Sequence, residues 1–175
     1  MNDQNWDTTF RGLFERCAQL HRAGDTKAEK WFTEADKAFL SAIGHTTQEF
    51  FDFVDDHCRY GAEGPTFETA LLIAAVRRDY FKVVMDGKFT GKTIPPSELP
   101  PKPAAVDGIP WLPRLIVKAK AKLRGEMDPD TMYGCGGDRG FFREHQLHPA
   151  DFLRVTWAAD GDDRKIIDWV KTKRL

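Results

Sequence analysis

The sequence predicts an all-α fold, a bundle of about eight helices, and three observations lead to this prediction. Apolar residues recur every three or four positions through most of the 175-residue chain, which is the period of an amphipathic helix. Residues typical of helix starts and ends flank these segments. No segment shows sustained two-residue alternation, the pattern of a half-buried strand. We therefore expect helix in more than half of the residues, against about a third in an ordinary domain.

Two helices are predicted in the first 44 residues. Residues 10–21 carry apolar side chains three or four apart, and Gly24 follows as a stop. A shorter helix is expected over residues 33–43, ended by Gly44.

Two more helices complete the amino-terminal half. Thr46 and Glu49 match a capping box, so the third helix is expected to start there. Pro65 suits the first turn of a fourth helix, which is expected to run to about Asp86. Its centre, ALLIAAV, is apolar on every side, which predicts a place in the middle of the fold.

A change of composition separates the two halves. Residues 88–110 hold six prolines and show no helical period, so we predict an extended connector laid over the surface. The connector divides one compact domain into an amino-terminal half, residues 1–87, and a carboxy-terminal half, residues 111–175.

Helical periodicity resumes after the connector. Pro113 lies near the first turn of a helix that starts at WLPR, and a short helix is expected from Asp138 to about His145. Pro149 occupies a first-turn position in the next segment, and the chain closes with the helical pattern DDRKIIDWVKTKRL.

The two halves share a pattern, which predicts an internal duplication. Residues 36–54 align without a gap over residues 138–156, so that Asp36 meets Asp138, Phe39 meets Phe141, and Phe50 meets Phe152. Asp36 and Asp138 are therefore expected to cap equivalent helices. Two related halves would enclose a cleft, the usual place for a ligand.

The same segments resemble a known bacterial family. IPWLPRLIVKAKAKLRGEM, YGCGGDRGFF, DFL and DDRKIIDWV are similar to the pattern of domain of unknown function 5069, over residues 108–170. The chain departs from that pattern at Gln146, where a helix-ending Gly is more usual. The resemblance implies a small helical bacterial protein and implies no activity.

Composition narrows the classes of partner. The net charge of −1 gives no global attraction for nucleic acid or anionic membrane, and the longest apolar run, residues 70–76, falls short of the roughly 20 residues of a membrane helix. Three widely spaced cysteines predict reduced thiols in a cytoplasm. No secretory signal is expected at the amino terminus. We expect neither nucleic acid nor membrane as a partner.

The most specific stretch is YGCGGDR, residues 133–139, and three interpretations stay open. It can be a tight turn in which Asp138 caps a helix and Cys135 is a small buried residue. It can hold an anion on the N–H groups of Gly136 and Gly137 with charge from Arg139. It can carry a reactive thiol at Cys135.

Other residues are candidates for the walls of that site. A ligand at the start of the Asp138 helix would be enclosed by Trp111, Arg114 or Tyr133. Arg77 and Tyr80 follow the apolar centre of the fourth helix, so they either line the cleft or belong to an internal ion-pair network.

The sequence does not decide whether the protein is an enzyme. It contains no Walker loop, HExxH, GxSxG or GxGxxG, and its His, Cys and carboxylate spacings fit no metal site, so no cofactor or metal is expected. Two functions stay open: binding of a small, anionic ligand between the halves, and presentation of a surface to another protein. The oligomeric state is left undecided.

Overall fold

The computed structural model describes residues 5–173, of which the greater part is helical. The helical share is 64%, so the predicted all-α class is confirmed. Within the described residues the α-helices are α1 (Trp6–Arg22), α2 (Glu34–Ala42), α3 (Thr47–Tyr60), α4 (Phe67–Val83), α5 (Leu112–Arg124), α6 (Gly136–Glu144), α7 (Pro149–Ala158) and α8 (Asp163–Lys171). Short 3₁₀ turns are η2 (Ala28–Lys30), η3 (Gly61–Glu63) and η4 (Pro96–Glu98).

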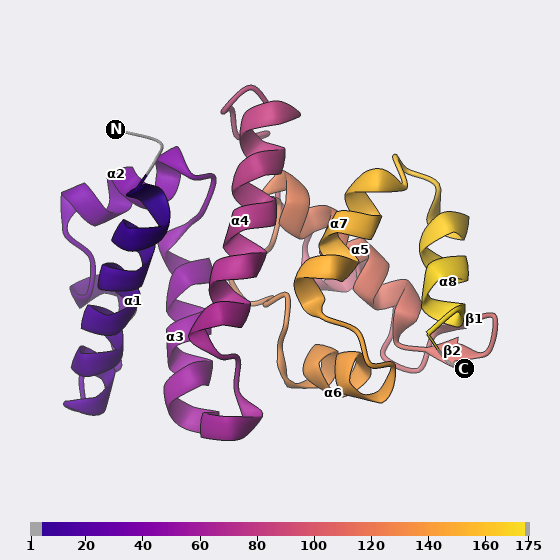
Figure 1. The fold of residues 1–175 in the computed structure, drawn as a ribbon, viewed down its shortest axis with the longest axis horizontal. Coiled ribbons are helices and arrows are strands. Elements are labelled where there is room, and N and C mark those ends of the chain that lie inside the picture. The colour runs from indigo at the N-terminus through magenta and orange to yellow at the C-terminus, as the bar shows by residue number, and fades with distance from the viewer. Residues whose placement is uncertain (1–4, 174–175) are drawn as a thin grey trace.

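Helix α4 lies between the two groups of helices, as its apolar centre predicts. Helices α1, α2 and α3 lie on one side of it and α5 to α8 on the other (Figure 1), and α4 contacts α1, α5 and α7. Ala70, Ile73 and Ala74 are fully or almost fully buried in this position. A helix with neighbours on both sides buries residues around its circumference, which explains its weak amphipathicity.

Capping boxes start the second and third helices. Thr46 caps α3, and the Glu49 carboxylate accepts the Thr46 N–H, as the sequence predicts. Thr33 caps α2, and Asp36 is the third residue of that helix, with its carboxylate accepting the Thr33 N–H. The prediction that Asp36 itself is the cap is therefore wrong, because Asp36 reaches back along the chain as the acid of a capping box.

The proline-rich segment is less extended than predicted. Besides η4 it contains a short antiparallel hairpin, β1 (Ala105–Val106) with β2 (Ile109–Pro110), which no sequence pattern indicated. Leu99 and Ile109 are buried, so the segment packs on the protein through these side chains.

Several features recur 102 positions apart. Helices α2 (Glu34–Ala42) and α6 (Gly136–Glu144) have the same length at that offset. Gly44 (φ 76°) and Gln146 (φ 53°), which follow them at the same offset, both have left-handed backbone. At Gly44 a Cβ would lie 2.6 Å from the Phe81 ring, so only glycine fits there, whereas Gln146 is accepted in the other half.

No helix in residues 5–173 combines the length and apolarity that crossing a membrane requires.

Candidate functional site

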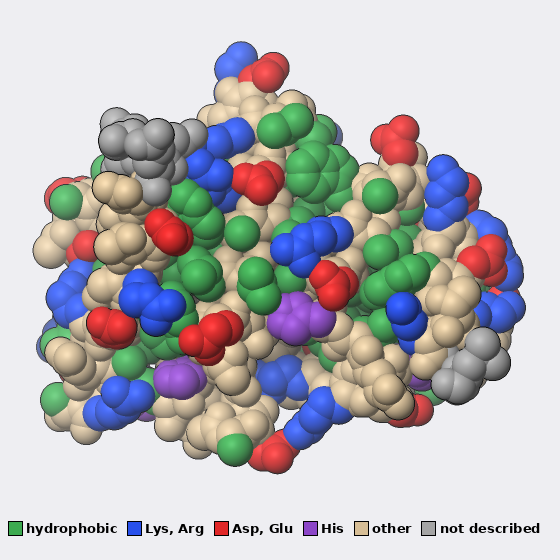
Figure 2. Space-filling view, viewed as in Figure 1, with side chains coloured by type: hydrophobic (Ala, Val, Ile, Leu, Met, Phe, Trp, Pro, Cys, Tyr) green, Lys and Arg blue, Asp and Glu red, His purple; other side chains and the backbone are tan. Residues whose placement is uncertain are grey.

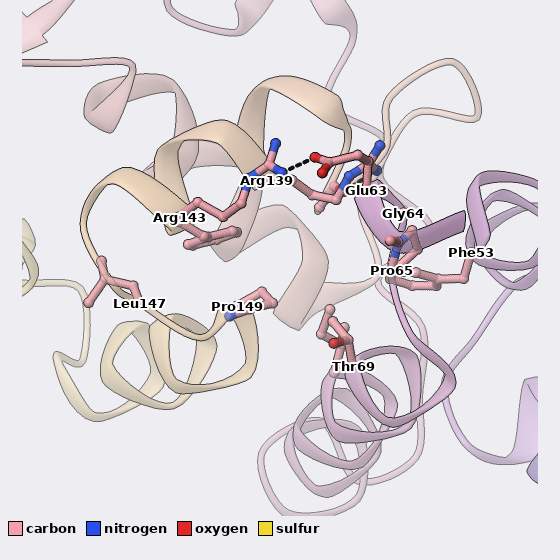
Figure 3. Close-up of a pocket in the computed structure, with 13 residues that line it drawn as sticks. Phe53, Glu63, Gly64, Pro65, Thr69, Arg139, Arg143, Leu147 and Pro149 are labelled. Atoms are coloured by element: carbon pink, nitrogen blue, oxygen red, sulfur yellow. Dashed lines mark hydrogen bonds and ion pairs between the residues drawn. The ribbon is translucent and has the colours of Figure 1, made fainter. Parts of the chain in front are cut away.

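A pocket lies where the amino-terminal and carboxy-terminal halves meet (Figure 3). Its volume is about 170 Å³, and its lining comes from α3, η3 and the start of α4 on one side and from α6 and the start of α7 on the other. Its position matches the expected cleft between the halves, and two residues of the YGCGGDR stretch, Gly134 and Arg139, line it.

The inner wall of the pocket is apolar and rigid. Phe53 and Ile73 contribute from the amino-terminal half, and Phe142 and Leu147 from the carboxy-terminal half. All four side chains are buried, because each also belongs to the hydrophobic core. The wall is therefore held by the packing of the core, and it offers a bound molecule apolar contacts.

Residues near the starts of three helices line this pocket. Thr69 lies in the first turn of α4 and Pro65 just before that helix, Pro149 is the first residue of α7, and Gly134 lies just before α6. Backbone N–H groups without helical partners give such ends a partial positive charge. Helix starts in the lining favour a negatively charged group in the pocket.

Arg139 lines the pocket but is held in place by protein groups. Its Nη1 donates to Oδ2 of Asp56 at 2.5 Å and to the Gly134 carbonyl at 3.0 Å. Its guanidinium lies 5.2 Å from the centre of the Tyr60 ring. Arg139 therefore connects α6 to α3, and both N–H groups of its Nη1 have protein acceptors.

Arg143 lies one turn further along α6 at the mouth of the pocket. Its Nη1 pairs with the Glu63 carboxylate of η3, and both side chains are largely exposed. Figure 3 shows both α6 arginines on the side that faces Glu63. An exposed ion pair is weak, so Arg143 can exchange its partner for an anion of a ligand.

Asp138 of the YGCGGDR stretch is the centre of a buried polar cluster beside the pocket. Asp138 is fully buried, and its Oδ2 accepts from Lys118 Nζ at 2.5 Å and from the Gly134 N–H at 2.9 Å. Its Oδ1 accepts from Trp111 Nε1 at 2.9 Å. Every oxygen of the carboxylate is occupied, which is how a buried charge is stabilised.

The predicted cap position in this stretch is wrong. Helix α6 begins at Gly136, so Asp138 is its third residue and accepts from a residue before the helix, not from one within it. The Trp111 ring covers Gly137, where a Cβ would lie 2.4 Å from the indole. The indole leaves no room for a side chain at Gly137, and an anion on the N–H groups of Gly136 and Gly137 stays a prediction.

Cys135 lies outside the pocket. Its Sγ is 3.3 Å from Lys118 Nζ, and with Gly136 it lines a separate hollow bordered by the carboxylates of Asp52, Asp55 and Asp56. Burial, the largest of several influences on Asp52, raises the pKa of that carboxyl to about 6.

Arg77 and Tyr80 do not reach the pocket either. Arg77 is fully buried beside Phe81 and Phe89, and its Nη1 contacts Met85 Sδ at 3.5 Å. Its Nε and Nη2 have no hydrogen-bond partner among the described residues. The predicted internal ion-pair network therefore does not include Arg77.

The other candidate wall residues have structural contacts. Tyr80 packs edge-on against Trp157, with ring centres 5.4 Å apart. Arg114 donates to the Pro100 carbonyl at 2.8 Å, which ties α5 to the proline-rich segment. Tyr133 is buried and donates to the Pro149 carbonyl at 2.8 Å, so it fixes the start of α7 beside the pocket.

Sequence reasoning missed most residues that form the pocket. Arg143 had a usable signal, since it lies four positions after Arg139 and so shares its helix face. Phe53, Ile73 and Leu147 had none beyond core periodicity, and nothing marked Glu63. In residues 5–173, no three His, Cys, Asp or Glu side chains are grouped so that they could hold a metal ion.

Comparison with known protein families, with curated proteins and with solved structures finds no match for the chain.

Proposed function

We propose that this protein binds a small organic anion, a carboxylate with an apolar body of about one ring, in the pocket between its halves. The size of the pocket is the observation that carries the proposal. Its volume is about 170 Å³. An apolar cavity of about 150 Å³ is large enough for benzene. A benzoate-sized ligand can therefore place its ring against the buried wall.

The charges at the mouth of the pocket favour a ligand with a negatively charged end. Residues near the starts of three helices line the pocket, and the ion-pair partner of Arg143 is an exposed glutamate. A carboxylate can accept two parallel N–H groups from a guanidinium, which fixes its orientation as well as its affinity. With the ring inside, the carboxylate would face Arg143.

Calorimetric titration with benzoate and with its neutral isostere benzamide tests the proposal. We expect benzoate to bind and benzamide to bind less tightly. Arg143→Gln should weaken benzoate binding about tenfold or more, the usual effect of losing a hydrogen bond to a charged group. Arg154→Gln is the matched control, because Arg154 is an exposed α7 arginine that pairs with Asp151 and does not line the pocket.

Blocking the pocket gives an independent test. Ala62 is exposed and lines the mouth, so Ala62→Trp can obstruct entry without disturbing the core. Benzoate binding should be lost in this variant while its melting temperature stays near that of the wild type. Absence of benzoate binding to the wild type would refute the proposed ligand class.

The alternative function, presentation of a surface to another protein, rests on different residues from those expected. Of the apolar connector residues, Leu99 and Ile109 are buried and Ile94 and Val106 half-buried. Of the five exposed large apolar side chains among the described residues, three lie instead at or just beyond the end of α4, the part that projects from the body (Figures 1 and 2): Val83, Val84 and Phe89. Sedimentation of the wild type and of Val83→Asp over a range of concentrations would show whether this end self-associates.

We infer that the two halves arose by duplication. The support is the common offset of 102 positions in α2 and α6, in the left-handed residues Gly44 and Gln146, and in two ion pairs, Arg16 with Asp36 and Lys118 with Asp138. The family resemblance, the bacterial source and the cytoplasmic location stay predictions.

A further inference from the structure

We propose that Glu63 is an internal competitor for the ligand: its carboxylate occupies Arg143 until an incoming anion displaces it. This inference rests on the proposed function and adds how the site is controlled. Glu63 and Arg143 both line the pocket, and their ion pair joins η3 of the amino-terminal half to α6 of the carboxy-terminal half.

The two pocket arginines differ in how firmly they are held. Arg139 pairs with Asp56 at 2.5 Å, and the two side chains are only 15% and 18% exposed. The side chains of Arg143 and Glu63 are 62% and 68% exposed. Water screens an exposed pair, so its net stabilisation is small. The Glu63–Arg143 pair is therefore the one that a ligand carboxylate can replace.

The backbone around Glu63 allows the carboxylate to leave without disturbing the pocket. Glu63 lies in a three-residue 3₁₀ turn between α3 and Gly64, and it makes its ion pair through its side chain alone. The Gly64 N–H donates to the Gly61 carbonyl at 3.0 Å, and a Cβ at Gly64 would lie 2.5 Å from the Asp56 carbonyl oxygen, so only glycine fits there. Rotation of the Glu63 side chain into solvent is then sufficient to free Arg143.

The chemistry of the two competing groups is the same. Glu63 presents a carboxylate to Arg143 from the protein, and the proposed ligand presents one from inside the pocket. Because only one of them can use the same guanidinium N–H groups, the affinity measured for the ligand is reduced by the stability of the Glu63–Arg143 pair. Removing the Glu63 charge should raise the affinity.

Benzoate titration of Glu63→Gln tests this inference. Glutamine keeps the size of the side chain and removes its charge. An exposed pair is worth about 0.2–1 kcal/mol, so benzoate should bind about two- to fivefold more tightly than to the wild type. In an Arg143→Gln background the same substitution should have no effect, because the group for which the two carboxylates compete is gone.

Glu68→Gln is the matched control. Glu68 is an exposed residue of the first turn of α4 and does not line the pocket. It carries the same charge close to the site, so it reports the general electrostatic effect. If Glu68→Gln and Glu63→Gln raise the benzoate affinity equally, the proposal that Glu63 competes for Arg143 is refuted.

The outcomes separate this inference from the proposed function. If wild type binds benzoate and Glu63→Gln leaves the affinity unchanged or weaker, the competition is refuted while the binding site stands. If neither form binds benzoate, the proposed ligand class fails and this inference fails with it.

Discussion

Lys118 Nζ lies 2.5 Å from Asp138 Oδ2, with the two side chains only 2% and 0% exposed. The equivalent pair 102 positions earlier is Arg16 with Asp36, at 2.6 Å, with exposures of 42% and 19%. Two ion pairs thus occur at the same sequence offset, one in the core and one near the surface. The difference in burial decides how much each pair contributes to stability.

Replacing Lys118 with Met should destabilise the protein by about 3–5 kcal/mol, because Asp138 would stay buried without its partner charge. Arg16→Met should cost no more than about 1 kcal/mol, since water can solvate Asp36. Urea unfolding of both variants measures the contrast. Equal losses of unfolding free energy in the two variants would show that burial does not determine how much each ion pair contributes.

Asp138→Ala should cost more than the roughly 1 kcal/mol expected of a helix cap, because Lys118 and the Trp111 N–H lose their acceptor. Urea unfolding of this variant measures the cost. A loss of only about 1 kcal/mol would contradict the buried-cluster interpretation.

Gly137→Ala should destabilise the protein by about 1–3 kcal/mol, because the new methyl group would overlap the Trp111 ring. Gly140→Ala in the same helix is the matched control: a Cβ added there would meet no atom within 4 Å, so alanine should stabilise α6 by about 0.5–1 kcal/mol. Thermal melts of the two variants should shift in opposite directions. An unchanged melting temperature of Gly137→Ala would mean that the Trp111 ring leaves room for a methyl group at this position.

Glu49→Ala should destabilise more than Thr46→Ala, which removes one cap and should cost about 1 kcal/mol. Glu49 completes the capping box and also accepts from Lys122 Nζ at 2.9 Å, and that lysine is 2% exposed. Its loss leaves a buried ammonium without its carboxylate. Comparable urea midpoints for the two variants would contradict this second role.

His45 should make stability fall as the pH drops below about 6.5. Burial, followed by the positive charge of Lys122, lowers the pKa of His45 from 6.5 to about 3, while Glu49 opposes the shift and Arg77 adds to it. Between these values the unfolded chain binds the proton and the folded protein does not, so acid favours unfolding.

The measurement is the free energy of unfolding of wild type and His45→Gln between about pH 7 and pH 4.5, within the range where the two states of His45 differ in protonation. The difference between the two proteins isolates His45 from Asp52, whose raised pKa acts in the opposite direction over part of this range. Parallel pH profiles would show that His45 does not contribute.

Features that depend on neighbours within a few positions could be recognised from the sequence alone. Helical periodicity and the capping box at Thr46 and Glu49 follow from contacts three or four residues apart, so they were predictable without a structure. The hairpin at 105–110 could not be recognised in this way, because its strands are too short to show alternation.

The long-range partners of these residues were decided by tertiary packing. Asp138 was recognised as a helix-start residue, yet its main partner is Lys118, 20 positions away, and Glu49 gained Lys122 from 73 positions away. The pocket combines Phe53 and Glu63 with Arg143, which lies 80 positions beyond Glu63 along the chain. No local pattern encodes such neighbours, because they are set by how α3, α4, α6 and α7 pack together.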